Sequence, residues 1–188
     1  MWDMHISCTN ESTSVALLAN NRTHTADDMV RSIPDIYYKN TKAKNILDKS
    51  RSWTMPANVA MLQRYIRDDP KIIVMLRPVD EIVKSFVELR KRNGWTSDFE
   101  QGLWEPNTEP LTRPLVGVEY AKGHNTGEYL FIEYNELVEN TSETLQKIYT
   151  FCDWETFPHW FNDISNPYPE NDSVWGFPGL HDVRPTIG

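Results

Sequence analysis

The stretch KIIVMLRPVDEIVKSF, residues 71–86, joins two different hydrophobic patterns. Ile72 to Leu76 form a continuous apolar run, which is typical of a parallel strand covered on both faces. From Val79 to Arg92, apolar side chains recur with the helical period, acidic residues open the segment, and basic residues close it, as the helix dipole favours. The sequence therefore predicts a strand that runs into Arg77 and a helix that begins after Pro78.

Other segments extend this alternation of strands and helices. EYLFIEY, residues 128–134, predicts another strand, and the residues after it regain helical spacing at Leu145, Ile148 and Phe151. The remaining predictions are helices over 12–20, 26–38 and 54–68, a short strand over 45–48, a long substrate-contacting loop over 95–114, and an ordered aromatic-rich tail over 157–188. Strands alternating with helices predict an α/β fold in which a parallel sheet is covered by helices on both sides.

The composition narrows the classes of protein and ligand. The 188 residues suit one domain over 1–188, and the net charge of -8 argues against a nucleic-acid partner. No apolar run has the length of a membrane span, so we expect a soluble, cytoplasmic protein with no membrane contact. Cys8 and Cys152 match no metal-binding spacing; we expect reduced, buried thiols and no bound metal.

Cationic side chains follow two of the predicted strands. Arg77 ends the strand over 72–76, and Lys49 and Arg51 follow the segment over 45–48. Ligands of parallel sheets bind beyond the carboxyl ends of the strands, so these cations predict a local anion site. Ser85 lies seven residues after Pro78, about 10 Å along the helix at nearly the same azimuth, and we expect it to be half covered beside the apolar stripe. The Arg77 fork and the Ser85 hydroxyl could then hold one phosphate.

Four segments, in order, resemble the sulfotransferase family that uses 3'-phosphoadenosine 5'-phosphosulfate (PAPS) as the sulfuryl donor. Arg77 and Ser85, eight positions apart across a strand-to-helix junction, resemble its 3'-phosphate-binding segment. The others are ILDKSRSW at 46–53, which resembles its lysine-bearing strand end, YLFIEYNELVENTSETLQKIYTFCDW at 129–154, and GLHDVRP at 179–185. The resemblance is to short microbial and viral members and covers most of the chain from about Lys44 onward.

The resemblance implies a fold, a reaction and a site. The fold would be a three-layer α/β sandwich related to P-loop nucleotide kinases, and the reaction would transfer a sulfuryl group to a hydroxyl or amine of a small-molecule or glycan acceptor. Lys49 would be the catalytic lysine that neutralises charge near the bridging oxygen, and Arg77 and Ser85 would hold the 3'-phosphate. Arg51 and Arg184 would add further anion contacts to the donor.

One part of the family pattern is missing from the sequence, and the residue for another part has several candidates. Members begin with a strand and a Gly-Ser/Thr-rich phosphate loop, whereas the first glycine here is Gly94. We expect an N-terminally incomplete domain; the alternative is a divergent member that has lost half of its donor site. The general base that takes the acceptor proton has four candidates, which are Glu11, His5, Asp48 and His181. The alternatives to a sulfotransferase are a noncatalytic nucleotide- or partner-binding relic of the fold and a small-molecule kinase-like enzyme. The sequence does not indicate the acceptor or the oligomeric state.

Overall fold

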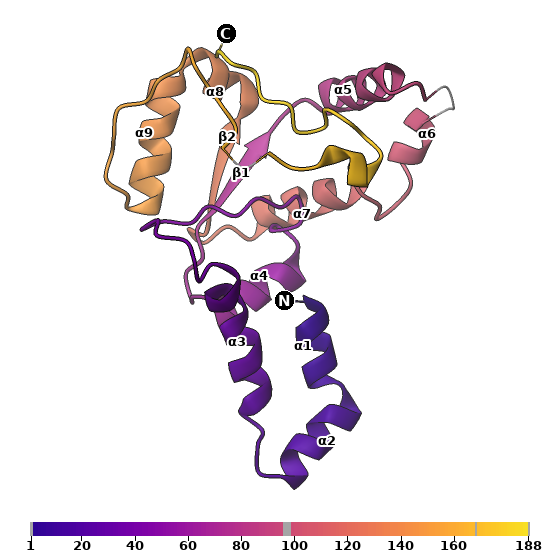
Figure 1. Cartoon of the computed structure of the whole chain (residues 1–188), viewed down its shortest axis with the longest axis vertical. Coiled ribbons are helices and arrows are strands. Elements are labelled where there is room, and N and C mark those ends of the chain that lie inside the picture. The colour runs from indigo at the N-terminus through magenta and orange to yellow at the C-terminus, as the bar shows by residue number, and fades with distance from the viewer. Residues whose placement is uncertain (1, 96–98, 168, 188) are drawn as a thin grey trace.

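A two-stranded parallel sheet forms the centre of the molecule (Figure 1). The structure, a computed structural model, describes residues 2–95, 99–167 and 169–187. Strand β1 (Ile72–Leu76) pairs with β2 (Tyr129–Glu133) in a register that places Ile72 beside Tyr129 and Leu76 beside Glu133. Both strands coincide with predicted ones, and the predicted α/β class with a parallel sheet is confirmed.

Helix α5 (Val79–Arg92) follows β1 with the predicted bounds. Its apolar stripe packs Val83 into a cluster with Leu103 and Leu111, which are 1% and 2% exposed. Leu103 ends helix α6 (Phe99–Leu103), and Leu111 precedes helix α7 (Thr112–Gly123). The prediction of a loop over 95–114 was therefore wrong in part, because its apolar residues fold back on α5 as helical structure.

Helices α4 (Pro56–Tyr65) and α7 pack against the sheet. Val59 of α4 and Ala121 of α7 share a buried cluster with Ile72, Val74 and Tyr129. Helix α4 was predicted, with its proline in the first turn where no backbone hydrogen bond is lost. Helix α7 was not, because it contains one proline and two glycines, which lower the intrinsic helix propensity of the segment. Packing against the sheet supplies the stability that this propensity lacks.

Helices α8 (Tyr134–Glu139) and α9 (Thr141–Cys152) follow β2, and α9 packs beside that strand. In the view of Figure 1, they lie on one side of the strands and α5 and α6 lie on the other. Cys152 is a free, half-buried thiol, and burial raises its pKa. Cys152 is less buried than predicted, and the side chain of Cys8 lies outside the described part of the chain.

Helices α1 (Trp2–Thr9), α2 (Glu11–Ala19) and α3 (Thr25–Tyr37) project from the body of the molecule (Figure 1). Polar contacts from α1 and α3 fasten them to α4. Both carboxylate oxygens of Asp27 accept hydrogen bonds from Arg64 at 2.9 Å, and Nδ1 of His5 lies 2.7 Å from the hydroxyl of Tyr65. Helices over 12–20 and 26–38 were predicted, whereas α1 was not recognised from its weak periodicity.

The predicted strand over 45–48 was wrong. Residues 45–48 belong to an extended connection between α3 and α4, and Ile46 and Leu47 are 45% and 73% exposed. A strand forms only beside a partner that satisfies its backbone groups, and none of the described strands pairs with this segment. Local apolar character was therefore not sufficient to make these residues a strand.

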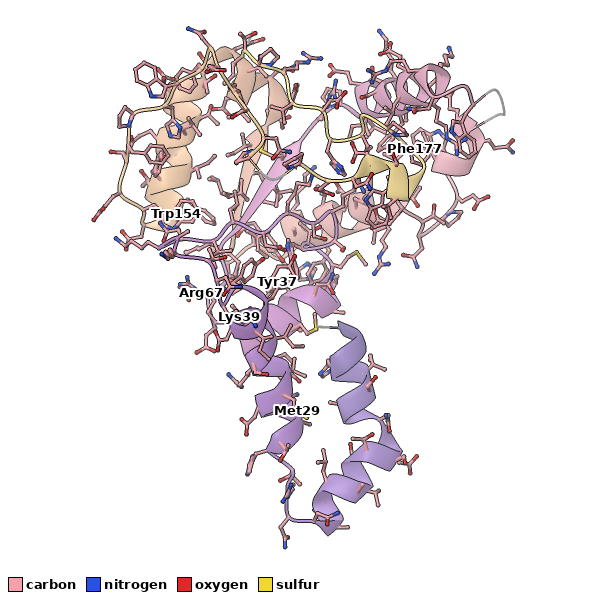
Figure 2. All side chains as sticks on the ribbon, viewed as in Figure 1. Met29, Tyr37, Lys39, Arg67, Trp154 and Phe177 are labelled. Atoms are coloured by element: carbon pink, nitrogen blue, oxygen red, sulfur yellow. The ribbon has the colours of Figure 1, made fainter. Side chains whose placement is uncertain are left out.

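The described residues of the C-terminal segment, 157–167 and 169–187, are mostly irregular. Its one helical turn in the described residues is the 3-10 helix η1 (Asp172–Trp175). The segment folds on itself, since the Ile164 N–H donates to the Pro185 carbonyl at 2.9 Å, and Figure 2 shows Phe177 beside η1 and α5. Within the described ranges, none of the helices combines the length and apolarity needed to cross a bilayer.

Candidate anion-binding cleft

One large cleft, of 2110 Å³, runs past β1 and α5. Residues from the connection over 44–54, the end of α9 and the C-terminal segment also line it. A site for one small molecule usually encloses about 300–1,000 Å³, so this cleft has room for two ligands. The five residues predicted to bind the donor all line it, and they are Lys49, Arg51, Arg77, Ser85 and Arg184.

Arg77 lies at the carboxyl end of β1, where the chain turns into α5. Its Nε–H donates to Glu81 at 3.0 Å, and its guanidinium lies over the ring of Tyr134 at 4.9 Å from the centroid. Tyr134 follows β2 directly, so the two parallel strands deliver the arginine and the aromatic ring to the same edge of the sheet. The terminal amino groups of Arg77 make no hydrogen bond within the residues that the structure describes, which leaves its two-pronged fork available to an anion.

Ser85 lies on α5, two turns beyond the start of the helix. Its side chain is exposed rather than half covered as predicted, because it faces the cleft instead of the apolar stripe. A hydroxyl in a helix often bonds to the preceding turn, but the described residues show no such bond for Ser85. It is therefore a neutral donor on the same cleft wall as Arg77.

Lys49 and Arg51 reach the cleft from the connection over 44–54 and not from a strand end. Asp48 anchors this connection, since one carboxylate oxygen accepts from the Tyr38 hydroxyl at 3.0 Å and the other from Nε1 of Trp53 at 2.9 Å. Both cations are exposed and have no ion pair within the part of the chain that is described. The three cations predicted at the sheet edge line one cleft. However, Lys49 and Arg51 come from an irregular connection and not from the end of a strand.

The C-terminal segment contributes Arg184 and His181 to the cleft. Arg184 is exposed, and the chain next to it is fixed by the hydrogen bond between Ile164 and Pro185. Nδ1 of His181 lies 2.5 Å from Oδ1 of Asp172, whose other oxygen accepts the backbone N–H of His181 at 2.9 Å. The backbone N–H of His181, and then its ring, lower the pKa of Asp172. Position 181 was predicted as a candidate base, but its carboxylate partner was not.

The four candidate bases separate by location. Glu11 stands in the first turn of α2, and His5 is joined to Tyr65 on α4; neither lines the cleft. Asp48 and His181 both line it. Both oxygens of Asp48 are committed to Tyr38 and Trp53, which makes it a structural anchor.

Glu81 and Tyr134 are the functional residues that the sequence reasoning missed. Glu81 is four residues after Arg77, a spacing at which side chains meet on a helix, and that spacing was visible in the sequence. Tyr134 could be found only by aligning the ends of the two strands, because it is 57 positions from Arg77 in the sequence. Together they orient the guanidinium from two sides.

The fold and the cleft define a class of protein, namely a mixed α/β protein with a cleft beside a parallel sheet that Arg77, Lys49, Arg51 and Arg184 line. The sequence model of the sulfotransferase family matches residues 5–159. The chain belongs to the sulfotransferase family, because this match covers well over half of its 188 residues. The predicted family is therefore confirmed.

Among solved structures, the chain is similar to one described as the sulfotransferase domain from the curacin biosynthetic pathway. The two share 15% sequence identity with a TM-score of 0.47, over 83% of this chain and 55% of that one. The chain thus spans little more than half the length of that domain. None of the curated proteins searched matches it.

Proposed function

We propose that this chain binds PAPS and transfers its sulfuryl group to a hydroxyl or amine of a small-molecule or glycan acceptor. The observation that carries the proposal is that Arg77 and Ser85 line one cleft with Lys49, Arg51 and Arg184 in a member of the sulfotransferase family. A net charge of -8 would repel a polyanionic donor, so a local cluster of positive charge is required for binding.

Each residue has a defined task in this proposal. The planar fork of Arg77 and the hydroxyl of Ser85 would hold the 3'-phosphate alongside α5. Lys49 would neutralise the charge that develops near the bridging oxygen as the sulfuryl group leaves, while Arg51 and Arg184 would add longer-range attraction. Hydrogen bonds from a charged donor to phosphate are about twice as strong as neutral ones, so Arg77 should dominate binding.

The contacts around Arg77 support a site for the 3'-phosphate of the donor. Its guanidinium is held by Glu81 and Tyr134 in the cleft that Ser85 also lines. The second candidate is a chain that binds the nucleotide at this place without transferring sulfuryl groups.

Isothermal titration with adenosine 3',5'-bisphosphate and with ATP tests the binding step. We expect clear preference for the bisphosphate, and Ser85→Ala should weaken it about fivefold because a neutral hydrogen bond contributes about 1 kcal/mol. Ser142→Ala is the matched control, since Ser142 is exposed on α9 outside the cleft. Preference for ATP would favour a kinase-like enzyme and would contradict the proposal.

A transfer assay with ³⁵S-labelled PAPS and a panel of alcohols, amines and glycans tests the reaction. Labelled product that depends on the chain and is lost in Lys49→Ala supports a sulfotransferase. Binding of the bisphosphate with no transfer to any acceptor would instead support the noncatalytic candidate.

A further inference from the structure

Asp172 and His181 form a pair in the C-terminal segment that is joined by two hydrogen bonds. The carboxylate of Asp172 holds both the ring and the backbone of His181, at 2.5 Å and 2.9 Å. Asp172 is 9% exposed and the His181 side chain 18%, so the pair is largely shielded from water. His181 also lines the cleft that contains Arg77 and Ser85.

The local backbone is built to hold this pair. Gly176 and Gly179 adopt φ values of 73° and 81°, a left-handed conformation that other residues rarely adopt. These two turns bring residue 181 back over η1, where the Phe177 N–H donates to the Asp172 carbonyl at 3.3 Å. Nδ2 of Asn93 donates to the Pro178 carbonyl at 3.1 Å, which fastens the turn to the end of α5.

The hydrogen bonds fix the chemical state of the histidine ring. The pKa of Asp172 is lowered by the N–H groups that it accepts, so the carboxylate is ionised at neutral pH and acts only as an acceptor. Nδ1 of His181 must therefore carry the hydrogen, and the lone pair of the neutral ring resides on Nε2. No hydrogen bond to Nε2 is present within the described residues. A carboxylate that orients a histidine in this way is a recurring feature of general-base sites.

A metal site is the competing interpretation, because Glu170 also approaches this pair. Oε2 of Glu170 lies 3.5 Å from Nδ1 of His181. However, two ligands of one zinc ion at about 2.0–2.1 Å in tetrahedral geometry would be separated by about 3.3 Å. The 2.5 Å between Nδ1 and Oδ1 is instead a short charge-assisted hydrogen bond, which favours a proton-transfer pair.

We propose that Nε2 of His181 is the general base of the transfer reaction and that Asp172 is its positioning residue; this rests on the proposed function. Nε2 removes the proton from the acceptor hydroxyl or amine as the acceptor atom forms a bond to sulfur. The bond between sulfur and the bridging oxygen breaks, and its electron pair remains on the 5'-phosphate of the released adenosine 3',5'-bisphosphate. The imidazolium then returns its proton to water.

Steady-state transfer by the full chain tests the base. His181→Asn keeps an amide N–H near the position of Nδ1 and so retains a donor to Asp172, but it has no base at Nε2. We expect kcat to fall about 10²- to 10⁴-fold, as for loss of a general base, with bisphosphate affinity unchanged within threefold. His124→Gln is the control, since His124 is exposed at the end of α7 and outside the cleft. An unchanged kcat in His181→Asn, with active wild type, would overturn the proposal.

The pH profile separates a base from a structural role. The kcat/KM of the wild type should decrease toward acid pH, and this decrease should be absent from the residual activity of His181→Asn. Asp172→Asn should lower kcat at least tenfold, whereas Asp163→Asn, in the same segment and exposed, should have no effect. An acid limb that survives in His181→Asn would assign the titration to another group.

Nuclear magnetic resonance of ¹⁵N-histidine-labelled protein tests the pair without any donor or acceptor. At neutral pH, His181 should carry its hydrogen on Nδ1 in the wild type and shift toward the Nε2-protonated form in Asp172→Asn. A ring already protonated at Nε2 in the wild type would overturn the proposal even if the chain is active. The chain could have the expected tautomer but neither bind the bisphosphate nor transfer sulfuryl groups. This result would refute both the proposed function and the assignment of His181 as the base, and the pair would then have a structural role.

Discussion

The Nε–H of Arg77 donates to Glu81 at 3.0 Å across one turn of α5, and this contact sets the direction of the guanidinium. Glu81 accepts from Nε and not from the two terminal amino groups, and Tyr134 lies against one face of the guanidinium plane. A flexible arginine loses side-chain entropy when it binds an anion, and an arginine already held in place loses less. The ion pair therefore prepares the residue for ligand binding.

Arg77→Ala should weaken binding of adenosine 3',5'-bisphosphate by 10- to 100-fold. A hydrogen bond to a charged group contributes about 1.5–3 kcal/mol, and we expect a loss of about this total size because Arg77 is partly exposed to water. Binding of adenosine 5'-monophosphate, which has no 3'-phosphate, should change little. Arg113→Ala, at an exposed position outside the cleft, is the control for loss of positive charge. Equal losses for both nucleotides would argue against a 3'-phosphate contact.

Glu81→Gln should lower the free energy of unfolding by less than about 1 kcal/mol. Both partners of this i,i+4 ion pair are more than one third exposed, and pairs of this kind contribute about 0.3–0.5 kcal/mol. Asp80→Asn removes a first-turn acid that has no ion pair in the described residues, so it isolates the helix-dipole contribution. Urea unfolding of both variants gives the difference, and a loss above 2 kcal/mol in Glu81→Gln alone would contradict this reading of the contact.

Gly117→Ala should destabilise the fold although alanine is the better helix former. A Cβ at this position would lie 2.4 Å from Oγ1 of Thr54 and 3.3 Å from the backbone nitrogen of Met55, where α7 packs on the segment before α4. Relieving such a clash costs about 1–3 kcal/mol. Gly123→Ala in the same helix meets no atom within 4 Å and should be neutral or slightly stabilising. The midpoint temperature of thermal unfolding should therefore fall clearly for Gly117→Ala and stay the same or rise slightly for Gly123→Ala.

Leu103→Ala should cost about 2–5 kcal/mol, since Leu103 is 1% exposed between α5 and α6 and its truncation leaves a cavity. Val116→Ala, 56% exposed on α7, should change the stability by no more than about 0.5 kcal/mol. Chemical denaturation measures both. A small effect of Leu103→Ala would show that the segment over 99–111 is not part of the cooperative core.

Asp172 should make stability depend on pH in a defined direction. Its pKa is lowered in the folded state from the ordinary value of 3.8, so its stabilising contribution is present above that value and is lost as pH falls through the folded pKa. The free energy of unfolding of the wild type should thus exceed that of Asp172→Asn at pH 7, and this difference should decrease below about pH 4. Urea unfolding at pH 7, 4 and 3 measures it. A difference that stays constant over this range would contradict the hydrogen-bonded carboxylate.

Part of the site was predictable because it depends on short-range order. The strand over 72–76, the helix over 79–92 and the positions of Arg77 and Ser85 between them follow from local hydrophobic spacing and chain geometry. Even the Arg77–Glu81 contact is a consequence of helix periodicity. The same rules failed at 45–48, where a strand pattern had no neighbouring strand, and at 112–123, where packing stabilises a helix that propensity disfavours.

The family and the two strands could be predicted from the order of four segments along the chain and from local hydrophobic patterns. The contacts of Tyr134 with Arg77 and of Asp172 with His181 appear only in the folded structure. The first contact depends on the register of two parallel strands, and the second on two left-handed glycines that reverse the chain. Neither is encoded in the spacing of the residues that meet, since contacts across strands and turns are fixed by the packing of the whole fold.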